Sequence, residues 1–207
     1  MTVPPAPPRR IGLFGGSFDP PHRAHRVLAE TALAALALDQ LRWLPAGAPW
    51  QKTGHVLAEP QHRAAMVALA IDGEPRFVLD ERELHRRGPS YTIDSVRELR
   101  AEQPQAQLFV VIGQDQYQRL HTWHAFDELL GSVTWAVAAR EGQLPRPDAA
   151  LAGRPHRVEV LPMPRLDVSA TVIRQRAARG EDLTALVAPA GARYIALHQL
   201  YRDPAGH

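Results

Sequence analysis

The sequence contains no cysteine among its 207 residues. This absence excludes disulfide bonds, zinc sites built from thiolates and a cysteine nucleophile. No apolar run approaches the length that a membrane-spanning helix needs, and the proline-rich residues 1–10 lack the apolar core of a secretory signal. We therefore expect a cytoplasmic protein with no membrane partner.

A large excess of charge of one sign is also absent. The 24 basic and 22 acidic side chains leave a net charge of only +2. A nucleic-acid-binding protein usually carries a concentrated basic surface, so we expect no nucleic-acid partner. One local group of basic residues comprises Arg82, His85, Arg86 and Arg87. This group is compatible with a small anionic ligand, although a solvated charged face is the commoner interpretation.

Short apolar runs alternate with helical patterns along the chain. Strands are predicted at residues 10–14, 41–45, 76–79, 108–112, 134–138 and 157–161, and helices at 22–38, 60–71, 92–103, 114–120, 124–130 and 192–201. Strands and helices in alternation, joined by short connections, predict an α/β fold with a parallel sheet flanked by helices. We expect a disordered lead at 1–9 and one domain at 10–202, with a small helical part at about 168–202.

The most informative segment is residues 15–25, which lie between the first predicted strand and the first predicted helix. Glycines let the backbone approach a ligand closely, and the free amides and dipole of a helix N-terminus attract phosphate. His22 and His25 are three residues apart, so they lie on neighbouring parts of one helical face. The segment predicts a site for the phosphates of a nucleotide, with two imidazoles beside it.

Several other interpretations of this segment fit less well. The Walker A pattern is absent, and Gly12, Gly15 and Gly16 have the wrong spacing for a dinucleotide-binding motif, which argues against an oxidoreductase of that type. His22 and His25 have no third ligand at a matching spacing, so we predict no metal held by the protein. A purely structural role as a helix cap would be common for a single histidine. It is much less common for two histidines beside Gly-Gly-Ser and Pro-Pro.

Residues 16–25 (GSFDPPHRAH) resemble the T/SFDPxHxGH motif of the nucleotidyltransferase superfamily, which transfers adenylyl or cytidylyl groups. Residues 168–174 (VSATVIR) resemble its companion motif ISSTxIR, with Ser169 as an expected helix N-cap. Two positions depart from the family pattern: Ala24 replaces a glycine and Ala170 replaces a serine. Neither change removes a charge, so we expect activity to survive, with Ala24 the point at which a bound phosphate would be crowded.

Further segments are similar to the bacterial nicotinate-nucleotide adenylyltransferases, so that the resemblance covers residues 10–202. They are residues 88–94, 112–115 and 120–124, Pro49 with Lys52, Arg63 with Met66, and the terminal pattern at 194–201. The resemblance implies a Rossmann-like nucleotidyltransferase fold. It also implies the transfer of the adenylyl group of ATP to nicotinate mononucleotide, which gives deamido-NAD and pyrophosphate, with Mg²⁺ carried by ATP.

The resemblance implies roles for individual residues. Catalytic roles fall on His22, His25, Lys52 and Arg174. Contacts with ATP fall on Gly15, Gly16, Ser17, Phe18, Gly113, Asp115, Arg140, Ser169 and Thr171. Contacts with nicotinate mononucleotide fall on Tyr91, Thr92, Trp123 and His124, whereas Arg63 and Met66 are interpreted as structural.

Three alternatives stay open. A phosphopantetheine adenylyltransferase would share the two nucleotidyltransferase motifs, but it is typically shorter and lacks the segments at 88–94 and 112–124. An enzyme that prefers nicotinamide mononucleotide would differ only in its acceptor. A nucleotide-sensing module without turnover is disfavoured because the basic residues of the motifs are intact: His22, His25, Lys52 and Arg174. A homo-oligomer is compatible with the sequence.

Overall fold

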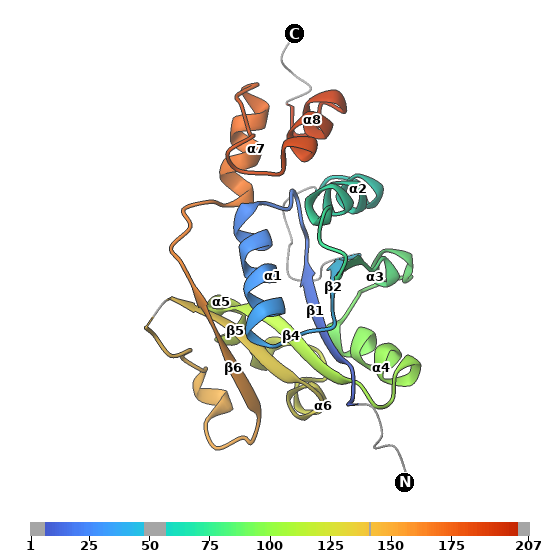
Figure 1. The fold of residues 1–207 in the computed structure, drawn as a ribbon, viewed down its shortest axis with the longest axis vertical. Helices are drawn as coiled ribbons and strands as arrows, with labels where there is room; N and C mark the ends of the chain where they lie inside the picture. The colour runs from blue at the N-terminus through green and yellow to red at the C-terminus, as the bar shows by residue number, and fades with distance from the viewer. Residues whose placement is uncertain (1–6, 48–56, 141, 203–207) are drawn as a thin grey trace.

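The computed structural model describes residues 7–47, 57–140 and 142–202. Within them, six parallel strands form one sheet in the order β3-β2-β1-β4-β5-β6 (Figure 1). The strands are β1 (Arg10–Gly16), β2 (Gln40–Pro45), β3 (Phe77–Leu79), β4 (Gln107–Gly113), β5 (Thr134–Arg140) and β6 (Arg157–Met163). The winding reverses between β1 and β4, and in such sheets ligands bind beyond the carboxyl ends of the strands at this switch point.

Helices cover both faces of the sheet, as predicted. One face packs against α1 (Arg23–Ala35) and α2 (Pro60–Ile71), and the other against α4 (Thr92–Glu102), α5 (Gln114–Tyr117) and α6 (Phe126–Ser132). A strand that is covered on both faces reads as a continuous apolar run, and β4 has the sequence QLFVVIG. None of the helices in the described ranges has the length and hydropathy to cross a membrane.

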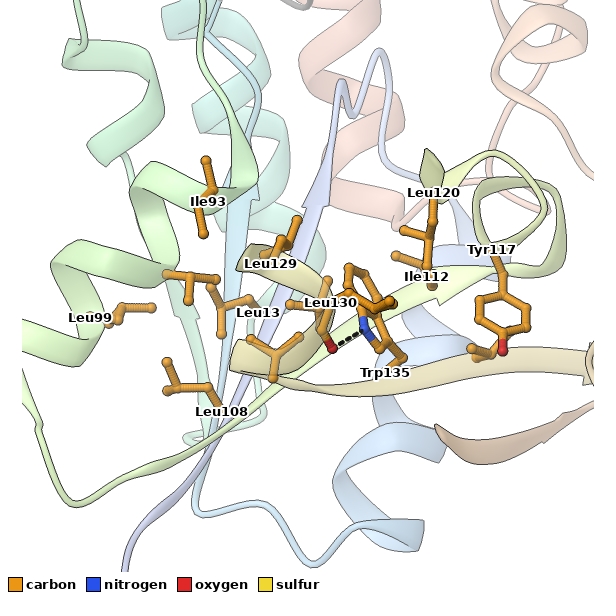
Figure 2. Close-up of a cluster of buried hydrophobic side chains, with 14 of the residues drawn as sticks. Leu13, Ile93, Leu99, Leu108, Ile112, Tyr117, Leu120, Leu129, Leu130 and Trp135 are labelled. Atoms are coloured by element: carbon orange, nitrogen blue, oxygen red, sulfur yellow. Dashed lines mark hydrogen bonds between the residues drawn. The ribbon is translucent and has the colours of Figure 1, made fainter. Parts of the chain in front are cut away.

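The two apolar cores alternate along each central strand. In β4, Leu108, Val110 and Ile112 pack on the α4–α6 side, whereas Phe109 and Val111 pack on the α1–α2 side. Figure 2 shows the first of these cores, in which the indole nitrogen of Trp135 donates a hydrogen bond to the carbonyl of Leu130 at 3.3 Å. The buried strands give the sheet a fixed register, so the loops at its carboxyl edge start from rigid positions.

One glycine of β1 has a purely structural role. A Cβ at Gly12 would lie 2.3 Å from Cδ1 of Leu41 and 2.8 Å from Cδ1 of Leu38. The side chains of the neighbouring strand and of the preceding turn therefore occupy the space that any larger residue would need. Gly12 serves close packing in the sheet and not ligand binding.

The C-terminal helical part stands beyond the carboxyl end of β1, next to α2 (Figure 1). It contains α7 (Ala170–Ala178) and α8 (Pro189–Leu197). A separate apolar cluster joins the two helices to α2, with Met66 from α2, Ile173 from α7 and Ile195 from α8. The amide of Arg23, the first residue of α1, donates to the carbonyl of Leu186 at 2.8 Å. This part is thus attached beside the phosphate-binding loop predicted at 15–25.

Some predicted boundaries are wrong. The predicted helix at 192–201 occupies Pro189–Leu197, because proline suits a first helical turn and Gln199, with φ of 50°, leaves the helical conformation. The first helix ends at Ala35 instead of residue 38, and Ala37 has φ of 45°.

Other short helices differ from the predictions as well. The predicted helix at 114–120 splits into α5 and a 3₁₀ turn at Leu120–Thr122, and the one at 124–130 is α6, shifted by two residues. A further 3₁₀ turn spans Ala149–Leu151. The sequence did not predict α3 (Arg82–His85). Residues 1–6 of the predicted lead lie outside the described residues.

Candidate active site

Residues 15–25 connect β1 to α1, as predicted, although β1 extends two residues beyond the prediction, to Gly16, and α1 begins at Arg23. This segment holds two stacked imidazoles. His22 is the residue before the first turn of α1, with φ of −141°. Its amide donates to Nδ1 of His25 at 3.1 Å, and the two ring centroids lie 3.7 Å apart. Because Nδ1 of His25 accepts this hydrogen bond, the proton of its neutral ring lies on Nε2. The backbone thus selects the tautomer of His25.

His22 is held as a neutral ring. Desolvation by burial lowers its pKa from 6.5 to about 4, only partly opposed by a backbone hydrogen bond. Its Nδ1 atom is buried. A neutral imidazole can donate one N–H bond to a phosphate oxygen without adding a full charge.

The second motif meets this loop from α7. Ser169 is the N-cap of α7, and its hydroxyl accepts from the amide of Val172 at 3.3 Å, which confirms the predicted cap. Arg174 donates through Nη1 to the carbonyl oxygen of Asp19 at 2.8 Å and through Nη2 to Oγ1 of Thr171 at 3.3 Å. Two segments 155 residues apart in the sequence are therefore joined by a direct hydrogen bond.

A buried arginine holds the same loop through hydrogen bonds to backbone carbonyls. Arg63, on α2, is 1% exposed, and its guanidinium donates to backbone carbonyls of three segments. The distances are 3.0 Å to Ser17, 2.7 Å to Ala46, 3.3 Å to Gly47 and 3.1 Å to Ala58. Burial lowers the pKa of Arg63, and the nearby carboxylate of Asp19 opposes that shift. The structural interpretation of Arg63 and of the buried Met66 is confirmed.

A cavity of about 430 Å³ opens beside the loop at the switch point of the sheet. Gly15, Gly16, Ser17 and His25 line one part of it, and Gly113 lines it from the end of β4. The residues predicted to hold the pyridine ring also line the cavity: Tyr91, Thr92, Trp123 and His124. The structure thus places part of the predicted phosphate-binding loop and the four predicted pyridine contacts along one cavity, whereas His22, Ser169, Thr171 and Arg174 are not among its lining residues.

One part of the cavity is lined by the rings of Tyr91, Trp123 and His124, and we call it the aromatic slot. The rings of Tyr91 and His124 stack with centroids 4.1 Å apart and planes 23° apart. Trp123 meets Trp135 edge-on at 5.9 Å, and its indole nitrogen is buried with no hydrogen-bond partner among the described residues. The aromatic rings therefore give this part of the cavity a flat, largely apolar wall, against which a planar ligand can stack.

Other predicted residues lie outside the cavity wall. Asp115 and Arg140 lie at the same carboxyl edge of the sheet and are exposed. The side chain of Phe18 is buried against Phe14 and Trp43, so only its backbone can reach a ligand. Lys52 lies outside the described residues.

Sequence reasoning missed several groups. Glu83, on α3, lines the cavity although it is only 7% exposed; Oγ of Ser95 donates to it at 2.9 Å, and burial raises its pKa. Asp19 stands inside the recognised motif, but its position, 1% exposed beneath the loop, could not be read from the pattern. The only signal for Glu83 was its proximity to the motif at 88–94.

The donor set of the site does not resemble a metal cage. In the part of the chain that the structure describes, no group of three His, Asp, Glu or Cys side chains could hold a metal ion. Mg²⁺ prefers oxygen ligands and keeps several waters, so it is commonly held by substrate phosphates. Imidazole, guanidinium and amide groups fit a phosphate chain that brings its own cation.

Comparisons with known proteins show the family to which the chain belongs. The cytidylyltransferase-like family model matches residues 13–176. A probable nicotinate-nucleotide adenylyltransferase of Methylibium petroleiphilum is 53% identical over 205 residues, covering 97% of this chain and 96% of the relative. Another, of Albidiferax ferrireducens, is 45% identical and covers 94% and 98%. The chain belongs to the nicotinate-nucleotide adenylyltransferases.

The fold of the family extends to more distant members. The nicotinic acid mononucleotide adenylyltransferase of Plasmodium falciparum, solved as a complex with NaAD, superposes with a TM-score of 0.78 at 18% identity. The match covers 93% of this chain and 97% of the Plasmodium chain. At this identity the likeness shows the fold alone, and it confirms the predicted Rossmann-like nucleotidyltransferase architecture.

Proposed function

We propose that this chain transfers the adenylyl group of ATP to nicotinate mononucleotide in the biosynthesis of NAD. The observation that carries the proposal is the single cavity that joins the two-histidine loop to the aromatic slot. A phosphate-binding end and a flat, apolar end in one cavity fit a reaction between two nucleotides. Membership in the nicotinate-nucleotide adenylyltransferases supports the identity of both.

The reaction needs positioning more than it needs a protein nucleophile. The 5′-phosphate of nicotinate mononucleotide is ionised near pH 7, so its oxygen attacks the α-phosphorus of ATP directly. The new oxygen–phosphorus bond forms as the bond from the α-phosphorus to the bridging oxygen breaks, and pyrophosphate leaves with that electron pair. Rate acceleration then comes from alignment and from donors that stabilise charge on the phosphoryl oxygens.

His25 is our candidate for the donor to the transferring phosphoryl group. Its Nδ1 is occupied by the amide of His22, so Nε2–H is the remaining ring donor. His22 adds a second, neutral donor beside it. The backbone of residues 15–18 would bind phosphate oxygens, and Ser169, Thr171 and Arg174 would hold the pyrophosphate end from α7. Lys52 keeps its proposed role in neutralising phosphate charge.

In this proposal the adenine of ATP and the pyridine ring of nicotinate mononucleotide occupy opposite ends of the site. Gly113 ends β4 and Asp115 lies in α5 directly after it, where its carboxylate would accept hydrogen bonds from ribose hydroxyls. Arg140 ends β5 and would lie near the adenosine. The pyridine ring enters the slot of Tyr91, Thr92, Trp123 and His124. Mg²⁺ comes with ATP as part of that substrate and neutralises phosphate charge.

The experiment that tests the proposal compares acceptors. We expect kcat/KM with ATP to be highest for nicotinate mononucleotide, lower for nicotinamide mononucleotide and undetectable for phosphopantetheine. The His25→Ala variant serves as the inactive control for contaminating activity. A higher kcat/KM for either other acceptor would overturn the proposed substrate, and ATP binding without any product would favour a nucleotide-sensing module. A cytoplasmic location and a homo-oligomer stay predictions.

A further inference from the structure

The hydroxyl of Tyr201 reaches into the phosphate loop from the end of the described chain. It donates to Oδ1 of Asp19 at 2.7 Å, across 182 residues of sequence. Asp19 is 1% exposed, so this bond is made in a nearly dry environment. A hydrogen bond from a hydroxyl to a buried carboxylate is among the stronger polar contacts in a protein.

Asp19 links this hydroxyl to the candidate catalytic arginine. Its backbone carbonyl accepts from Nη1 of Arg174 at 2.8 Å, and its Oδ2 lies 4.0 Å from the same nitrogen. The amide of Ala58 also donates to Oδ1, at the longer distance of 3.3 Å. The position of Asp19 therefore sets where the guanidinium of Arg174 points.

Tyr201 is itself fixed in place. The amide of Leu200 donates to the carbonyl of Ile195 at 3.0 Å, which closes the end of α8, and Tyr201 has φ of 66°. The ring packs against the apolar cluster of α2, α7 and α8, and its hydroxyl lies 3.9 Å from the sulfur of Met66. Burial and the negative charge of Asp19 raise the pKa of Tyr201, so the hydroxyl stays a donor at any physiological pH.

We infer that Tyr201 is a positioning residue for the triphosphate of ATP, which acts through Asp19 on Arg174 and on the loop that carries His22 and His25. The C-terminal helical part then has a function in the reaction besides packing. The inference rests on the proposed function for the identity of the nucleotide. The link itself stands on two hydrogen bonds of Asp19: its carboxylate accepts from Tyr201, and its backbone carbonyl accepts from Arg174.

The test is the removal of one oxygen atom. Tyr201→Phe keeps the ring in its apolar cluster and deletes only the donor to Asp19. The matched control is Tyr194→Phe: Tyr194 lies on α8, and its hydroxyl hydrogen-bonds to His62 at 2.9 Å, away from Asp19. Both variants lose one tyrosine hydroxyl, so a general loss of stability would affect both.

Binding of α,β-methylene-ATP, measured by calorimetry, is the primary readout, because it needs no turnover. We expect about tenfold weaker binding to Tyr201→Phe, the size of one lost hydrogen bond to a charged group, and no change for Tyr194→Phe. The KM for ATP should rise with it, while the KM for nicotinate mononucleotide stays within about twofold of the wild-type value. Equal loss in both variants, or unchanged analogue affinity in folded Tyr201→Phe, would overturn the inference.

Two further arms keep the result interpretable. If Tyr201→Phe does not fold, Asp19→Ala removes the acceptor of the same hydrogen bond while keeping the backbone carbonyl that Arg174 contacts, and an unchanged affinity there would contradict the inference. If the wild-type protein binds the analogue but makes no deamido-NAD, the proposed function fails, while the comparison of analogue affinities still decides the role of Tyr201.

Discussion

Replacing Arg63 by alanine should destabilise the protein more than any other single arginine change outside the candidate catalytic set. The guanidinium is 1% exposed and donates four hydrogen bonds, at 2.7 to 3.3 Å, to the carbonyls of Ser17, Ala46, Gly47 and Ala58. The substitution leaves these acceptors unsatisfied and leaves the nearby buried Asp19 with less compensating charge.

The expected cost follows from these contacts. Each hydrogen bond contributes on the order of 1 kcal/mol after the exchange with water, so the loss of the four bonds together costs about 4 kcal/mol. We expect a loss of about 4 kcal/mol in the free energy of unfolding. For a chain of this length, 1 kcal/mol shifts the melting midpoint by roughly 3 °C, so the midpoint should fall by about 12 °C.

Thermal unfolding followed by circular dichroism measures this shift. Arg165→Ala is the matched control, because the side chain of Arg165 is 78% exposed and pairs only with the exposed Asp167 among the described contacts. Exposed pairs contribute at most about 1 kcal/mol, so its midpoint should stay within about 3 °C of wild type. An Arg63→Ala variant that melts as close to wild type as this control would refute the supporting role of Arg63.

Three further predictions concern the phosphate loop. His25→Ala should lower kcat by about a hundredfold or more while the protein stays folded; His25→Asn, which can still accept from the amide of His22, should be equally inactive but melt closer to wild type, and near wild-type kcat in either would contradict the role of His25. The folded-state pKa of His22, about 4, lies below its ordinary 6.5, so this site contributes stability that is complete above about pH 6.5 and is lost as pH falls towards 4, by roughly 2 kcal/mol after allowing for partial exposure. His22→Asn should therefore lose less stability over that pH range. The free energy of unfolding, measured by urea titration at several pH values, checks this, and an equal dependence on pH in the variant and the wild type would show that burial of His22 does not affect stability. Ala24→Gly should tighten binding of α,β-methylene-ATP if the methyl group crowds a phosphate, and unchanged affinity would dismiss that concern.

The sheet was readable from the sequence because its strands are buried on both faces. The apolar run of β4 and the two glycines that end β1 each carry a local pattern. The short helix α3 was missed because four residues show no periodicity. The start of α8 at Pro189 is a local signal that the prediction overlooked, whereas its end depends on the left-handed conformation of Gln199, which the sequence does not show.

The site was readable only where a motif stood in one segment. The two histidines and the cap at Ser169 were found in this way. Arg63 was also predicted to be structural, but its contacts with carbonyls of three segments were not predicted, nor was the contact of Tyr201 with Asp19 across 182 residues. Such contacts depend on the folded arrangement, and no spacing in the sequence encodes them.

The most direct test of the central claim uses nicotinate mononucleotide labelled with ¹⁸O in its 5′-phosphate. The enzyme is incubated with this substrate, unlabelled ATP and Mg²⁺, and the products are analysed by mass. Attack on the α-phosphorus predicts deamido-NAD that retains all of the label, with unlabelled pyrophosphate in equal amount. Label in the pyrophosphate, or AMP without any dinucleotide, would contradict the account.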